Sequence, residues 1–246
     1  MTKAIILLTK IILIAALSLL FVSCRYNINL NDGVEGSGNV IIQTRNVTEN
    51  FSGIRTGGGL EVVVEQGNAV QVKVEADDNI MPLVKTEVRD GVLVIETEGS
   101  FSSQNGPVIT VTMPNIKELS VDGGGNLHSN GTLISDRLVL TSEGGASMDV
   151  NAEADKLVMD ASGGGNIHAR GKALDVEANA SGGSPIDAEQ LQANNVKADA
   201  SGGGSISVYP ILSLTADASG GGGISYHKIP KQLNKSESGG GWVSEQ

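Results

Sequence analysis

The chain of 246 residues contains a single cysteine and few aromatic or basic side chains. One cysteine cannot form a disulfide within the chain, so no covalent crosslink is available to hold the fold together. The 17 lysine and arginine residues are outnumbered by 28 acidic residues, which gives a formal net charge of −11. Because nucleic acid is bound by basic surfaces, this charge balance argues against a nucleic-acid partner.

Helical periodicity is also missing after residue 24, whereas glycine is abundant at 33 residues. Much of this glycine stands in a recurring phrase that reads DGGGNLH, EGGASMD, SGGGNIH, SGGSPID, SGGGSIS, SGGGGIS and SGGGW. The first glycines of the phrase lie at 123, 144, 163, 182, 202, 220 and 239, so the steps are 21, 19, 19, 20, 18 and 19 residues. A period near 20 residues with glycine corners predicts an all-β fold, a parallel β-solenoid.

Small apolar residues recur at fixed offsets from the glycine pairs. Residues two apart on a strand share a face, so we expect these columns to line the interior, with equivalent residues stacked about 4.8 Å apart. Glycine at each corner supplies the positive φ that a tight turn requires. The columns are Leu138, Leu157, Val176, Val196 and Leu214; Leu119, Leu140, Met159, Ala178, Ala198 and Ala216; Val121, Ser142, Ala161, Ala180, Ala200 and Ala218; and Leu127, Met148, Ile167, Ile186, Ile206 and Ile224.

Residues 1–23 have the pattern of a signal peptide, with a lysine-containing start and an apolar run that ends at Val22. The ending LFVSC resembles a bacterial lipobox, which would make Cys24 the site of lipidation. The alternative is an uncleaved membrane anchor with an incidental cysteine, because about 20 apolar residues span a bilayer.

The exported part is predicted to have three regions. Residues 24–39 are polar and rich in asparagine and glycine, which predicts a flexible tether. Residues 40–114 predict β-strands, either as a separate N-terminal β region or as the first coils of the solenoid. Residues 115–246 hold the glycine-cornered repeats.

Several short motifs outside the repeats occur together. They are Phe51 with Ile54, Gly57-Gly58, VVVEQG at 62–67, VKVEADDNI at 72–80, Asp90-Gly91 with Leu93 and Ile95, and VTMP at 111–114. With the repeated GGGN phrases they make residues 40–228 resemble the head GIN domain family of auto-transporter adhesins, found widely in Bacteroidota. The resemblance implies a right-handed parallel β-helix on an envelope protein with an adhesive or structural role.

Outward-facing columns are the candidate ligand sites. One column, five residues after each first glycine, contains His128, Asp149, His168 and Asp187. Stacked coils would place these side chains in one line, where they could hold Zn²⁺ or Ni²⁺. The alternative is that the alternating charges only avoid repulsion between coils, because a straight ladder lacks the tetrahedral arrangement that zinc prefers.

A second outward column, three residues before each first glycine, contains Asp160, Asn179, Asp199 and Asp217. Asp199 and Asp217 would be direct neighbours, and a Ca²⁺ ion between them would relieve their repulsion. The alternative is that solvent screens both charges. Apart from this ion, no cofactor is expected.

No sequence motif supports catalysis, because the cysteine belongs to the lipobox and neither a G-x-S-x-G elbow nor a P-loop occurs. Aromatic residues that could contact a ligand or cap the last coil are limited in the repeats to Tyr209, Tyr226 and Trp242. Trp242 stands at the open end, where we expect it to plug the apolar interior.

The sequence therefore predicts a non-catalytic outer-membrane lipoprotein, an adhesin or scaffold that is displayed on the surface or faces the periplasm. Its partners would be the membrane, through the lipid on Cys24, and a protein or glycan bound on flat sheet faces. The alternative is a glycan-binding or glycan-cleaving β-helix protein that uses the three aromatic residues. Self-association by end-to-end stacking through Trp242 is a third hypothesis.

Overall fold

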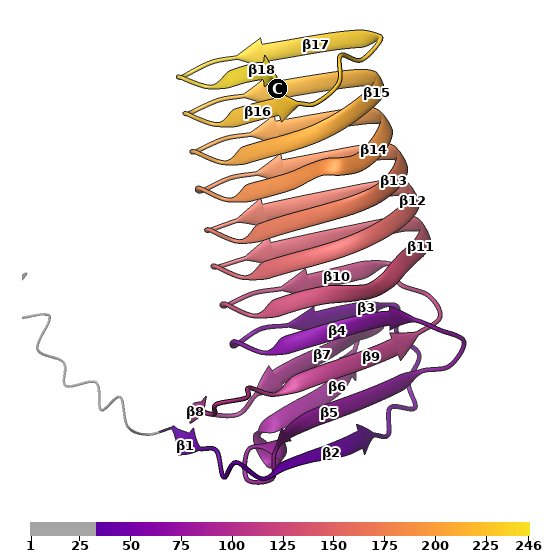
Figure 1. The fold of residues 1–246 in the computed structure, drawn as a ribbon, viewed down its shortest axis with the longest axis vertical. Coiled ribbons are helices and arrows are strands. Elements are labelled where there is room, and N and C mark those ends of the chain that lie inside the picture. The colour runs from indigo at the N-terminus through magenta and orange to yellow at the C-terminus, as the bar shows by residue number, and fades with distance from the viewer. Residues whose placement is uncertain (1–32) are drawn as a thin grey trace, which may run out of the picture. The chain divides into compact units, whose positions relative to one another are not determined.

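Stacked parallel strands make up most of the structure, a computed structural model that describes residues 33–246 (Figure 1). They form a parallel β-solenoid of about seven turns, as the repeats predict. Within this part of the chain no helix is long and apolar enough to cross a membrane. The signal peptide expected over 1–23 and the lipidation site Cys24 lie outside the described residues.

The first half of the described chain contains short strands. They are β1 (Val34–Glu35), β2 (Val40–Arg45), β3 (Gly53–Thr56), β4 (Glu61–Gln66), β5 (Gln71–Asp77), β6 (Val84–Arg89), β7 (Val92–Thr97), β8 (Phe101–Ser102) and β9 (Val108–Met113), with one 3-10 turn, η1 (Met81–Leu83), between β5 and β6. The repeat region contains β10 (Glu118–Val121), β11 (Asn126–Glu143), β12 (Ser147–Ser162), β13 (Asn166–Ala180), β14 (Pro185–Ala200), β15 (Ser205–Ala218), β16 (Gly223–Tyr226), β17 (Gln232–Glu237) and β18 (Trp242–Glu245).

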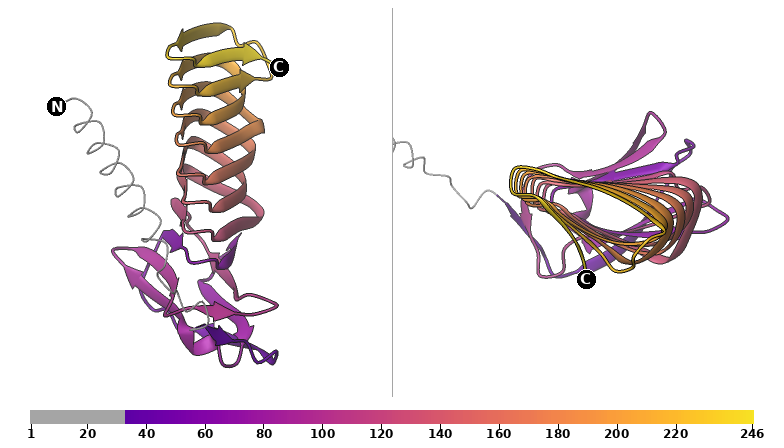
Figure 2. Two further views of the ribbon diagram at one scale, coloured as in Figure 1. Left: turned by 90° about the vertical axis from the view of Figure 1, so that its left-hand side faces the viewer. Right: turned by 90° about the horizontal axis from the view of Figure 1, so that it is seen from above.

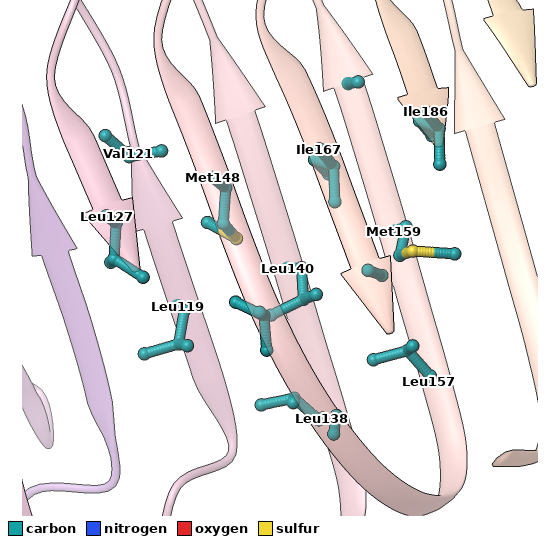
Figure 3. Packing of buried hydrophobic residues seen from close by; sticks show 14 of the residues in the cluster. Leu119, Val121, Leu127, Leu138, Leu140, Met148, Leu157, Met159, Ile167 and Ile186 are labelled. Carbon is teal, nitrogen blue, oxygen red and sulfur yellow. The ribbon is translucent and has the colours of Figure 1, made fainter. Parts of the chain in front are cut away.

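Each of the long strands β11 to β15 runs from one glycine corner, around a rounded bend, to the next corner (Figure 2). Equivalent residues of successive coils pair in parallel register, for example Leu138 with Leu157 and Leu157 with Val176. All four predicted interior columns are buried, and the close view shows their side chains stacked between the two walls of the coil (Figure 3). The expectation for the core is confirmed. Burial of these apolar side chains stabilises the stack because each coil covers the apolar faces of its neighbours.

Glycine pairs form the sharp corners. Gly163 and Gly164 have φ of 59° and 84°, which L-residues with a Cβ rarely adopt. A Cβ on Gly165, the third glycine of this corner, would overlap the backbone oxygen of Ser142 in the preceding coil, so close stacking also requires glycine there. The same positive φ occurs at Gly58, on which Gly123 stacks. The first corner therefore lies 65 residues before the first repeated phrase, and the sequence pattern did not reveal it.

The region 40–114 is continuous with the solenoid and is not a separate domain. Strand β3 pairs in parallel with β10, and β4 pairs in parallel with β11, so both belong to the first coil. The intervening strands extend this end: β7 and β9 pair in parallel with β3 and β4, whereas β2, β5 and β6 add antiparallel strands. Of the two alternatives for this region, the structure favours the first coils.

The segment expected as a flexible tether, residues 24–39, is held against the body from Val34 onward. Strand β1 pairs in parallel with β8. The Asp78 carboxylate then accepts hydrogen bonds from the Ser37 hydroxyl at 2.5 Å and from the Asn39 amide at 2.9 Å. The expectation of a tether is therefore wrong for residues 34–39, because β1 is paired with β8 and the hydrogen bonds hold Ser37 and Asn39 to Asp78, directly after β5.

Replacing Asp78 by alanine is expected to free this segment. The hydrogen bonds from Ser37 and Asn39 hold the pKa of Asp78 below its ordinary value of 3.8. The stabilisation by these hydrogen bonds is thus fully present above pH 3.8. It is lost as the pH falls below that value and Asp78 becomes protonated at its lowered pKa. At pH 7 we expect an endoproteinase specific for glutamate to cut after Glu35 roughly tenfold faster in Asp78→Ala than in the wild type. Asp136→Ala, in an exposed bend, is the control; equal rates in all three chains would contradict the prediction.

Candidate functional site

The outer walls of the solenoid carry ladders of polar side chains. The first, the histidine–aspartate ladder, consists of His128, Asp149, His168 and Asp187, which pair in register across four successive strands. Their order along one line is therefore as predicted. Ser207 and Ser225 continue it, and their hydroxyls lie 2.7 Å apart.

The contacts within this ladder are pairwise. His168 Nδ1 lies 3.1 Å from Asp187 Oδ2, and His128 Nδ1 lies 4.0 Å from Glu61 Oε1. Asp149 forms its ion pair with Arg170, a partner that the sequence analysis missed although it stands two residues beyond His168, on the same face. Among residues 33–246 no group of three or more histidine, cysteine, aspartate or glutamate side chains is arranged to hold a metal ion. Binding of Zn²⁺ or Ni²⁺ here stays a hypothesis without geometric support.

The second ladder, the aspartate ladder, consists of Asp160, Asn179, Asp199 and Asp217, again in register. The Asn179 amide donates to Asp160 Oδ1 at 2.7 Å, and Lys197 Nζ lies 3.1 Å from Asp199 Oδ2. The hydrogen bond and charge of Asp199 raise the pKa of Lys197, so the ammonium form is retained beside the carboxylate. These partners reduce the repulsion that a Ca²⁺ ion would relieve, and Ca²⁺ binding between Asp199 and Asp217 stays a prediction.

A third ladder was not foreseen. The Asn195 amide donates to Asp175 at 2.8 Å, and the Ser213 hydroxyl donates to the Asn195 side-chain oxygen at 2.8 Å. The repeat pattern does align this column, because Asp175, Asn195 and Ser213 each stand seven residues before the first glycine of the next corner, at 182, 202 and 220. The walls thus present continuous hydrogen-bonded rows that cross several coils.

The rounded bends also form a groove of about 410 Å³ that crosses several coils. Apolar side chains from three bends line it, namely Ile134, Leu174 and Ile211, beside the polar groups of Glu153 and Lys172. Ile134 is 64% exposed and Leu174 is 50% exposed. Exposed branched apolar side chains beside charged ones are typical of a protein-binding surface.

The three aromatic residues do not share one surface. Trp242 pairs with Gly223 in the outward column, and its ring lies over that glycine, where an added Cβ would overlap the indole. The expectation that Trp242 plugs the interior is wrong; Tyr226, 7% exposed, stacks on the inward Val208 and fills the end of the core. Tyr209 lies under Lys228, whose Nζ is 5.7 Å from the ring centre. No stacking surface for a sugar joins the three rings.

The open end of the last coil is covered by charge. Lys235 and Glu237 of β17 stack on Ala216 and Ala218, so they occupy positions that are apolar in the earlier coils. Lys235 Nζ lies 3.5 Å from Glu237 Oε1 and 3.3 Å from the Val243 carbonyl oxygen. The Val243 backbone N–H donates to Glu237 Oε1 at 2.9 Å. We call these two residues the end pair; the sequence analysis had assigned this capping role to Trp242.

Comparison with known proteins identifies relatives of this architecture. The family model described as "Putative auto-transporter adhesin, head GIN domain" matches residues 50–230. No curated protein matches the chain.

Solved structures have the same fold. A protein described as a "putative adhesin" from Bacteroides fragilis NCTC 9343 is 26% identical, with a TM-score of 0.79 over 87% of this chain and 100% of that one. A second "putative adhesin", from Parabacteroides distasonis ATCC 8503, is 24% identical with a TM-score of 0.71, over 87% and 100% of the two chains. A "Putative lipid binding protein" from the same strain is 23% identical with a TM-score of 0.68, over 87% and 99%. The last two matches support the fold alone.

Proposed function

Because the chain belongs to the head GIN domain family of auto-transporter adhesins, we propose that it is a non-catalytic adhesin or scaffold of the cell envelope. The observation that carries this proposal is the outer wall of the solenoid. Hydrogen-bonded ladders cross several coils there, and the apolar groove of the bends lies beside them. A partner would be bound by many weak polar contacts over a rigid surface, and not in a single deep site.

The proposed location is the outer membrane, to which a lipid on Cys24 would anchor the chain. The lipobox-like sequence LFVSC supports the anchor, and the family description supports an envelope location. In this proposal the membrane is one partner, held by the lipid, and a protein or glycan ligand is the other. The acidic net charge of −11 fits a partner whose own surface is neutral or basic.

Protease treatment of intact cells tests surface display. Trypsin cuts after arginine, and Arg25 directly follows the proposed lipidated cysteine. If the chain is displayed outward, we expect blotting to find most of it released from intact cells into the supernatant within minutes. A periplasmic marker protein that stays uncut is the control for intact cells.

A Cys24→Ser variant separates the anchor from the fold. We expect this variant to leave the membrane fraction while it keeps the thermal unfolding temperature of the wild type, because the strands and the apolar core are formed by residues from Val34 onward. Full protection of the wild type until the cells are lysed would refute outward display and would favour a periplasmic scaffold. If display is confirmed, arrays of host glycoproteins and glycans are the next measurement.

A further inference from the structure

One charged side chain is buried away from the solenoid walls. Asp77, at the end of β5, is only 3% exposed. It lies under the segment that joins β1 to β2 and beside the loop after β8; a Cβ on Gly36 would overlap its Oδ2. Three segments that are far apart in sequence therefore close around one carboxylate.

This carboxylate lacks a cationic partner among the residues that the structure describes. Within residues 33–246 no lysine, arginine or histidine nitrogen lies within 4.0 Å of it. Burial of a charge is strongly unfavourable unless a counter-charge, hydrogen bonds or a metal ion compensates for the lost hydration. Its single side-chain hydrogen bond in the described chain comes from the Ser103 hydroxyl, 2.7 Å from Oδ2.

The Ser103 hydroxyl lies within hydrogen-bond distance of two acceptors. Ser103 Oγ also lies 2.9 Å from the Asn105 carbonyl oxygen, but a serine hydroxyl has only one hydrogen to donate. Asn105 is exposed, so water can hydrogen-bond its carbonyl when the hydroxyl donates to Asp77. Within residues 33–246 the other oxygen of the carboxylate, Asp77 Oδ1, has no hydrogen bond. Among the described residues, the carboxylate thus has one hydrogen bond and no counter-charge.

The same carboxylate lines a polar pocket of about 370 Å³. Glu35 is the second acidic residue of its lining, which also contains the neutral polar residues Ser102, Gln104 and Asn105. None of the described residues that line it is basic. We refer to it as the Asp77 pocket.

We propose that the Asp77 pocket binds a calcium ion. Ca²⁺ is held in proteins by carboxylates, backbone and amide carbonyls and waters in flexible geometry, and these are the groups that the pocket offers. The ion would balance the charge of Asp77 and satisfy the oxygens that Ser103 cannot. Mg²⁺ fits less well, because it requires a tight octahedral set and retains its waters. The ion would hold the segment that joins β1 to β2 against the end of β5.

Calorimetric titration of the full chain with CaCl₂ tests the proposal, with thermal unfolding followed in Ca²⁺ and in chelator. We expect one ion per chain, with a dissociation constant on the order of 10⁻⁴–10⁻³ M, as in extracellular modules. We also expect an unfolding temperature several degrees higher in Ca²⁺ than in chelator. No binding heat at several millimolar Ca²⁺ would overturn the proposal.

Two variants locate the ion. Asp77→Asn is expected to abolish the response to Ca²⁺ and yet to unfold at a higher temperature than the wild type in chelator, because the neutral amide removes the uncompensated charge and brings its own hydrogens. Glu35→Gln, at an exposed position, is expected to weaken Ca²⁺ binding at least fivefold and to leave the unfolding temperature in chelator unchanged. This variant keeps the test valid if Asp77→Asn does not fold. Asp90→Asn, in an exposed turn, is the matched control and should bind as the wild type.

The aspartate ladder is the competing location. If Asp199→Asn with Asp217→Asn removes the binding heat while Asp77→Asn retains it, the ion belongs to the ladder and the proposal for the Asp77 pocket fails. Retained binding in the ladder variant and lost binding in Asp77→Asn would support the pocket.

Discussion

Leucine at both positions of the end pair, Lys235→Leu with Glu237→Leu, is expected to make the chain associate end to end. These two side chains stack directly on Ala216 and Ala218, so leucine would extend the apolar columns of the core to the exposed end. Within residues 33–246, β17 pairs only with β15 and β18 only with β16, and an unpaired strand edge is a template for another strand. Inward-pointing charges are a common way to prevent such pairing.

Sedimentation velocity measures this effect. At micromolar concentration we expect the double variant to shift to dimers or larger species, whereas the wild type does not associate through this end. The matched control is Lys85→Leu with Glu98→Leu, which removes an exposed ion pair of 3.3 Å in the first half of the described chain and adds the same two side chains. An equal shift in both variants would mean that added surface leucine alone drives association.

Trp242→Ala tests the hypothesis that the chain self-associates by end-to-end stacking through Trp242. Trp242 is 46% exposed on the outer wall of the last coil. If the wild type already associates as its concentration rises and Trp242→Ala abolishes this, the tryptophan contact is the cause and the end pair does not block assembly. If the wild type sediments as one species at all concentrations, self-association through Trp242 is refuted.

Ala198→Leu is expected to be the most destabilising single substitution in the middle of the repeats. Ala198 is fully buried and stacks between Ala178 and Ala216, which are also buried, so three additional carbons would have to displace side chains of the core. Overpacking of a dense core costs about 1–3 kcal/mol and occasionally more. Because each coil contacts only its neighbours, we expect the loss to be greatest in β13 to β15.

Hydrogen exchange resolved by segment, together with thermal unfolding, checks this prediction. Lys197→Leu, at the adjacent outward position, adds a leucine where solvent accommodates it and loses only an exposed ion pair, worth about 0–1 kcal/mol. We expect fast exchange in β13 to β15 for Ala198→Leu and near wild-type exchange for Lys197→Leu. Similar effects of both substitutions would contradict the interior packing of this column.

The sequence alone determined the solenoid, its interior columns and the order of residues along the first two ladders. A solenoid repeats its environment along one direction, so a fixed offset from the glycine corner predicts which residues stack and which face they share. The same rule contained information that the analysis did not use. Trp242 stands three residues after Gly239, in the outward column, and a shift of one residue exchanges the faces of a strand.

Only the tertiary structure decided the contacts that do not follow this period. The first coil at Gly58 is separated from Gly123 by an insertion of strands, so no repeat spacing connects them. Arg170 forms an ion pair with Asp149 of the neighbouring coil, and a long side chain can reach several partners, so the sequence does not specify which one it contacts. The Asp77 pocket unites Gly36, Asp77 and Ser103, which come from three segments with no shared pattern. The repeat period thus predicts how the coils stack. Ion pairs and buried groups that join distant segments depend on the tertiary structure, which brings those segments together.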